Sequence, residues 1–158
     1  MGTLHPALAQ AWGVTGTLRY SLELPEETPS NNIIKGMHFK DYMHMRRRFR
    51  LFVLKALKSE RPALPIEQSF IVVRRHCAGQ LDWDNALGGL KPVLDCLVMR
   101  SDKNPDGLGL IRDDSPRSMP YPPFMEQLKA KRNDGHTEIL IFEVGSEALT
   151  IQAPQVAA

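Results

Sequence analysis

Two aspartates separated by a single residue, Asp82 and Asp84, are the side chains in this sequence best suited to chemistry. If residues 81–84 are extended, both carboxylates point to the same side, because side chains alternate along a strand. A second acidic pair, Asp113 and Asp114, follows further along the chain. Carboxylate oxygens are the ligands that a hard cation such as Mg²⁺ prefers. We therefore expect the two pairs to form a metal site, provided that the fold brings them together.

A carboxylate-held divalent ion suits the hydrolysis of a phosphodiester. That reaction needs an activated water, a neutralised non-bridging oxygen and a stabilised leaving oxyanion, and divalent ions supply all three. A lysine nearby adds positive charge where negative charge develops in the transition state. Lys91, which follows the first acidic pair, is the candidate for this role.

Each of these residues also has an ordinary structural explanation. Asp84 is of a type that commonly caps a helix N-terminus. Lys91 lies four residues before Asp95, which is the spacing of a surface ion pair on a helix. Residues 113–116 (DDSP) are typical of a turn. Trp83, between the first two acids, could pack in the core or stack on a base. Taken singly, none of these motifs decides the function.

The basic residues are clustered, although the net charge of the 158-residue chain is only +2. Segregated charge fits a protein that holds a polyanion with one surface and metal ions with another. Ordinary solvated faces of helices and strands are the alternative explanation. The residues expected to bind DNA phosphates are Arg46, Arg47, Arg48, Arg74 and Arg75.

The composition indicates one folded domain. The chain has the length of a single ordinary domain, and 42% of its residues are hydrophobic, enough for a core. Cys77 and Cys96 lack metal-ligand spacing and are expected to be buried thiols in a reducing compartment. No signal peptide is recognisable at the N-terminus, and no apolar stretch approaches the ~20 residues that span a bilayer. A soluble cytoplasmic protein is the expectation.

Three strands are expected from alternating patterns or runs of β-branched and aromatic residues. They are residues 17–24, residues 68–77, expected to be a central strand, and residues 136–144. The turn signal Asn-Asp-Gly at 133–135 predicts a hairpin. It favours a strand at 125–132, which by itself fits helix or strand.

Two main helices are expected. Residues 40–58 carry apolar side chains at three- and four-residue steps, with the arginines largely between them. Residues 85–99 have a helical pattern that Gly88, Gly89 and Pro92 interrupt, so a kink or a late start is expected. A short helix at 6–11 is possible on composition. The resulting fold class is α+β, with a small mixed sheet and the two main helices packed on one face.

Together, four motifs in this order resemble the RusA family of Holliday junction resolvases, found in bacteria and their prophages. They are residues 29–32 (PSNN), 82–85 (DWDN), 91–97 (KPVLDCL) and 109–114 (GLIRDD). The resemblance spans roughly residues 17–144. It leaves residues 1–16 as an N-terminal extension and 145–158 as a C-terminal tail.

The resemblance implies a RusA-like fold and a homodimeric endodeoxyribonuclease that uses Mg²⁺ or Mn²⁺. Such an enzyme binds four-way DNA junctions by their structure and cuts them with paired nicks, in DNA recombination and repair. The family's metal-binding aspartates fall on Asp82, Asp84 and Asp114, with Asp113 as a possible additional ligand. Its essential lysine falls on Lys91.

The chain departs from the family pattern around Gly88-Gly89, where it carries about three extra residues before Lys91. On a continuous helix from Asp84, this insertion would move the lysine one turn, ~5 Å, along the axis and keep it within ~60° of the same face. Asn31 and Asn32 of the first motif are expected to contact DNA. A non-catalytic DNA-binding module is the competing hypothesis. A hydrolase of small phosphoesters is a third, which the basic clusters disfavour.

Overall fold

The structure is a computed structural model that describes residues 16–58 and 60–145. The short helix considered at 6–11, nearly all of the N-terminal extension and the tail from residue 146 lie outside the described residues.

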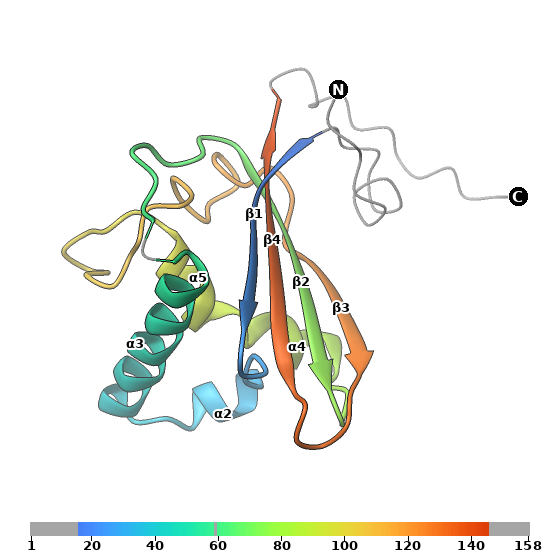
Figure 1. The fold of residues 1–158 in the computed structure, drawn as a ribbon. Helices are drawn as coiled ribbons and strands as arrows, with labels where there is room; N and C mark the ends of the chain where they lie inside the picture. The colour runs from blue at the N-terminus through green and yellow to red at the C-terminus, as the bar shows by residue number, and fades with distance from the viewer. Residues whose placement is uncertain (1–15, 59, 146–158) are drawn as a thin grey trace, which may run out of the picture.

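A mixed sheet of four strands forms the centre of the fold (Figure 1). The strands lie in the order β1 (Gly16–Leu24), β4 (His136–Val144), β2 (Ser69–Cys77) and β3 (Phe124–Lys129). Strand β4 is antiparallel to both of its neighbours, β1 and β2, whereas β3 runs parallel to β2. The three strands expected from sequence patterns are confirmed, with bounds that agree to within one residue at each end.

Strand β2 is an inner strand because its sequence can be buried on both faces. Residues 69–73 are all buried, and a strand covered on both faces reads as a continuous apolar run. Ile71 and Val73 contribute to the core beneath the helices, whereas Phe70 and Val72 belong to a second apolar cluster on the other face. The prediction that this segment is a central strand is therefore confirmed.

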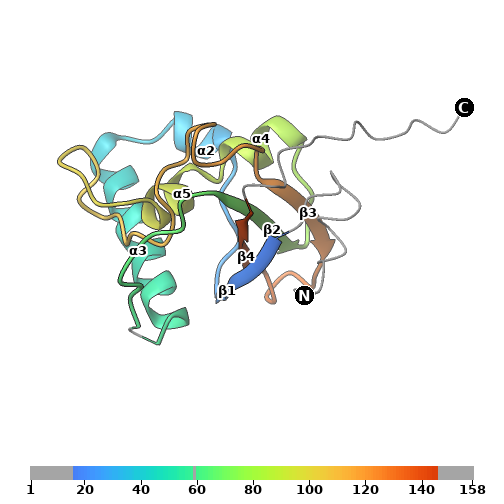
Figure 2. The ribbon, with the colours of Figure 1, turned by 90° about the horizontal axis from the view of Figure 1, so that it is seen from above.

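The helices gather on one side of the sheet, as the view from above shows (Figure 2). They are α2 (Asn31–Lys35), α3 (Phe39–Ala56), α4 (Trp83–Gly88) and α5 (Lys91–Leu97). This arrangement confirms the α+β class. None of the helices described is both long and apolar enough to cross a membrane.

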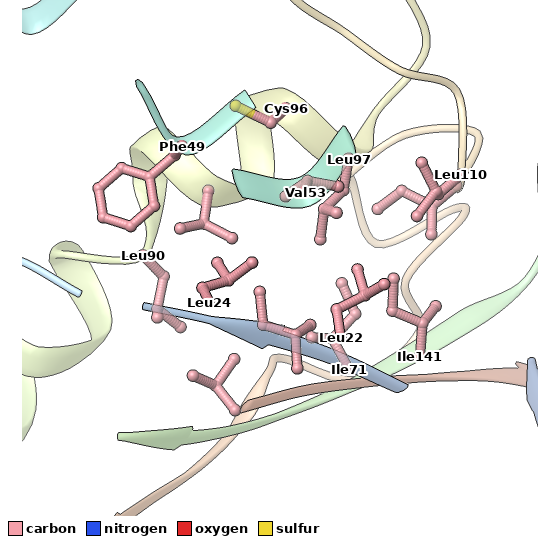
Figure 3. Close-up of a cluster of buried hydrophobic side chains, with 14 of the residues drawn as sticks. Leu22, Leu24, Phe49, Val53, Ile71, Leu90, Cys96, Leu97, Leu110 and Ile141 are labelled. Atoms are coloured by element: carbon pink, nitrogen blue, oxygen red, sulfur yellow. The ribbon is translucent and has the colours of Figure 1, made fainter. Parts of the chain in front are cut away.

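The main core lies between α3, α5 and the sheet (Figure 3). The apolar stripe predicted for the long helix supplies Met45, Phe49, Val53 and Leu57, all of them buried. From the sheet, the core receives residues such as Leu22, Leu24, Ile71 and Ile141. Both cysteines are buried and free of disulfides, as expected, and burial raises the pKa of the Cys96 thiol to about 12.

The predicted hairpin at residues 133–135 is wrong. Residues 124–129 do form a strand, but β3 and β4 are not hydrogen-bonded neighbours, because β2 lies between them. The turn therefore carries the chain past β2 rather than folding one strand back on the other. Placing a strand on each side of β2 satisfies the backbone groups along both edges of this largely buried strand.

Candidate metal and DNA site

The first acidic pair lies at the start of α4. Asp82 is the N-cap residue, with φ −59° and ψ 148°, and Asp84 lies in the first helical turn. The condition that residues 81–84 are extended throughout is not met, because the helix begins at Trp83. An N-cap aspartate normally accepts a hydrogen bond from the first turn, yet the carboxylate of Asp82 makes no such bond. Both carboxylates are exposed and are available to a ligand.

The two carboxyl groups of the second acidic pair, Asp113 and Asp114, have pKa values shifted in opposite directions. A hydrogen bond from the Ser115 hydroxyl lowers the pKa of Asp113. The pKa of Asp114 is raised, first by partial burial and then by the neighbouring Asp113, with a smaller contribution from Asp95. Asp114 therefore occupies an anionic environment, and a cation bound there would favour its charged form.

The four predicted ligands do not form a completed metal site. Across residues 16–58 and 60–145, no three side chains of His, Cys, Asp or Glu lie close enough together to hold a metal ion. The chemistry of the donors nevertheless fits Mg²⁺, because all are carboxylates and the Asp82 carboxylate is unused by its helix. The assignment of Asp82, Asp84, Asp113 and Asp114 as metal ligands stays a prediction.

Lys91 is the first residue of α5, and its side chain is 63% exposed. Its ammonium lies 3.6 Å from Oδ2 of Asp95, the ordinary ion pair expected from their spacing. The helix that starts at Trp83 ends at Gly88, and a new one starts at Lys91, which confirms the predicted interruption. A continuous helix therefore does not connect Asp84 to the lysine, and the one-turn displacement expected for Lys91 on such a helix does not occur.

Asp95 is the centre of a polar network that the sequence patterns did not reveal. Its Oδ2 accepts a 2.7 Å hydrogen bond from the hydroxyl of Tyr42 and lies 3.8 Å from Nη1 of Arg46. Its backbone carbonyl accepts a 2.6 Å hydrogen bond from the side-chain amide of Asn104. Arg46 also donates through Nε to Asp106, at 2.9 Å. The network ties α3, α5 and the loop after α5 together.

Two of the arginines expected to bind phosphates are buried instead. Arg46 is 6% exposed and is held by the two acids of the network just described. Arg75 is 5% exposed, and its guanidinium donates to the carbonyls of Thr28 and Gly79 and to the carboxylate of Glu27. Because acids inside the fold pair with both guanidinium groups, these two arginines are assigned to the interior rather than to DNA phosphates.

The other three arginines differ in their surroundings. Arg48 pairs with Glu26 at 3.1 Å, and Arg74 pairs with Glu126 at 3.2 Å. Arg47 is exposed on α3 and has no ion pair within the described residues. Of the predicted set, Arg47 is therefore the side chain most available to a phosphate.

Residues 29–32, the first of the four motifs, pack against Gly88 and Gly89. Ser30 caps α2 by accepting from the backbone N–H of Asn32, at 3.1 Å. A Cβ added at Gly89 would lie 1.7 Å from the carbonyl oxygen of Pro29, and one at Gly88 would lie 2.5 Å from the side chain of Asn31. The glycines thus allow residues 29–32 to approach α4. Helix α2 was not predicted, although a Ser-Asn-Asn sequence is a recognisable helix start.

No protein-family model matches this chain, and no curated protein matches it. The fold by itself defines an α+β protein with helices on one side of a mixed four-stranded sheet.

Proposed function

We propose that the protein is a metal-dependent endodeoxyribonuclease of RusA type, acting in the cytoplasm on branched DNA such as four-way junctions. The observation that carries the proposal is the pair of exposed aspartates at the start of α4, of which Asp82 leaves its helix uncapped. A carboxylate that makes no capping hydrogen bond keeps its oxygens available to a metal ion. The order of the four motifs supports the same reaction.

In this proposal Asp82, Asp84 and Asp114, with Asp113 beside them, would hold Mg²⁺ or Mn²⁺. Such an ion, when bound, supplies a Lewis acid for the phosphate and an acidified water. Lys91 would place its exposed ammonium against the charge that develops on the phosphate. Asn31, Asn32 and Arg47 would hold the DNA backbone near α4 and α3. Paired nicks require two active sites, so the active form would be a homodimer with two-fold symmetry.

The test is incubation of the protein with a synthetic four-way junction and with linear duplex, each with and without Mg²⁺. Paired, Mg²⁺-dependent nicks in the junction are expected, and equal, metal-independent behaviour on both substrates would refute the proposal. Asp84→Asn should abolish cleavage and leave junction binding intact or stronger, because one repulsive charge is removed. Full cleavage by that variant would show that the acidic pair is not part of the active site.

A non-catalytic DNA-binding module is the second candidate, and the absence of three converging acids within the described residues favours it. The two candidates differ in metal binding. Crystals soaked in Mn²⁺ should show anomalous density among Asp82, Asp84 and Asp114 if the protein is a nuclease. Soaked crystals with no density there, together with junction binding, would support the module.

A further inference from the structure

We propose that a basic groove at the C-terminal end of α3 binds the sugar-phosphate backbone of DNA. The groove is defined by Arg19, Lys58, Arg61 and Arg100, none of which was among the residues expected to bind DNA. The inference rests on the proposed function only in taking DNA as the polyanion.

Two adjoining hollows form the basic groove. One, of about 390 Å³, lies between residues 19–22 of β1 and residues 56–58 at the end of α3. The other, of about 310 Å³, lies between residues 61–65 and the segment that includes Met99 and Arg100. Both are lined by Arg61 and Pro62, so the two hollows adjoin at this segment of the chain.

The charge of the basic groove favours an anionic ligand. Its four cations face a single lining acid, Glu60. Lys58, Arg61 and Arg100 have no ion pair within the described part of the chain. Arg19 pairs with Glu143, but both side chains are about half exposed, and an exposed pair of this kind is easily exchanged for another anion. Cations that no internal acid neutralises are what a phosphate backbone requires.

The backbone at Lys58 gives an independent reason to assign a role to its side chain. Lys58 has a φ of 53° and is the one non-glycine residue with positive φ in the described residues. It follows the C-cap residue Leu57, at the position where helices commonly end in glycine. A lysine in this conformation is less favourable for folding than glycine. Residues held in such conformations often serve a function, and here the side chain lines the groove.

The exposed edge of the sheet adds neutral donors. Strand β1 is an edge strand (Figure 1), and its residues 19–22 line the first hollow. Backbone N–H groups of β1 that no described strand pairs can donate to phosphate oxygens, as backbone N–H groups do in many DNA complexes. An edge strand can also accept a peptide as an additional strand. The excess of cations over acids favours DNA, and an acidic peptide becomes an alternative outcome of the test.

The experiment measures binding of a fluorescent four-way junction and a fluorescent duplex by anisotropy, in EDTA and over a range of salt concentrations. The variants are Lys58→Gly and the double variant Arg61→Ala with Arg100→Ala. The control is Lys55→Ala, which removes an exposed lysine from the same end of α3 that does not line the groove. Thermal unfolding of each variant is measured in parallel.

The double variant should bind at least about tenfold more weakly near physiological salt. Its slope of log affinity against log salt should be shallower by about two. Lys58→Gly should bind more weakly than the wild type while its Tm is unchanged or higher, a combination that a purely structural role cannot give. Lys55→Ala should bind within about twofold of the wild type.

Binding by both groove variants within twofold of the wild type would overturn the proposal, as would an equal loss in the control. Competition by polyglutamate together with unchanged DNA binding in the variants would assign the groove to an acidic peptide and also overturn it. A wild type that binds DNA through the groove but never cuts it would refute the proposed nuclease function alone. A wild type that cuts while the variants bind normally would refute the groove alone. A wild type that binds no DNA would refute both.

Discussion

The hydroxyl of Tyr42 on α3 donates a 2.7 Å hydrogen bond to Oδ2 of Asp95 on α5, across 53 residues of sequence. The same carboxylate oxygen lies 3.6 Å from the ammonium of Lys91. Burial, followed by the bond to Asp95, raises the pKa of Tyr42, so the hydroxyl stays protonated and donates throughout the physiological range. This contact therefore connects the longest helix of the fold to the lysine of the candidate site.

Replacing Tyr42 by phenylalanine removes only this hydroxyl. A hydrogen bond to a charged group contributes about 1.5–3 kcal/mol, so the free energy of unfolding should fall by about that amount. Urea denaturation measures the change. Tyr20→Phe is the control, because the Tyr20 hydroxyl has no hydrogen bond to the described residues. Equal stabilities of the two variants would contradict the role given to the Tyr42–Asp95 contact.

Arg46 and Arg47 are adjacent in sequence and should behave in opposite ways. Arg46→Ala leaves Asp95 and Asp106 without their buried cation, and removing one partner of a buried ion pair costs about 3–5 kcal/mol. Arg47→Ala removes an exposed side chain, so its stability should stay within about 0.5 kcal/mol of the wild type. Urea denaturation gives both values, and anisotropy should show weaker DNA binding for Arg47→Ala. A stable Arg46→Ala protein would disprove the assignment of Arg46 to the interior.

The close approach of residues 29–32 to α4 predicts the effect of adding one methyl group. Gly89→Ala would place a carbon 1.7 Å from the carbonyl oxygen of Pro29, so the backbone must move. Overpacking of this kind costs about 1–3 kcal/mol or more, and the thermal unfolding temperature should drop clearly. Gly79→Ala is a matched control, since nothing lies within 4 Å of the added carbon. A similar Tm for both variants would show that the motif and α4 are not packed as described.

The raised pKa of Asp114 predicts a pH-dependent gain in stability for Asp114→Asn. Burial and the neighbouring acids make ionisation of this carboxyl harder in the folded protein than in the unfolded chain. The resulting destabilisation is fully present above the folded-state pKa and disappears below the unfolded value of about 3.9. In the absence of divalent ions, the variant should therefore have a higher Tm than the wild type near neutral pH, and the difference should vanish by about pH 3.

Thermal unfolding in EDTA between these two pH values measures the effect. Asp102→Asn provides an exposed aspartate in a loop as the control and should show no gain. A gain that persists at the acidic end would have to come from the amide itself rather than from the lost charge. Adding Mg²⁺ at neutral pH should reverse the order of the two proteins if Asp114 is a metal ligand.

The sequence by itself determined most of the local elements, although α2 was not predicted. Strand β4 has the predicted bounds, and α3 begins and ends within two residues of prediction, because burial of one face leaves a period in the sequence. The glycines and proline of residues 88–92 correctly indicated an interrupted helix, because these residue types disfavour a continuous helical backbone. The types and order of the four aspartates and Lys91 also came from sequence alone, together with the chemistry that they suit.

Only the tertiary structure decided which of these residues meet. Neighbouring arginines look alike in sequence, yet a rotation of ~100° per residue turns Arg46 toward acids far along the chain and Arg47 toward solvent. The place of β3 beside β2, and the part of Asp95 in joining α3 to α5, likewise depend on contacts between distant segments. Periodicity records how one element faces the core, whereas a site is made by packing between elements, which no local pattern encodes.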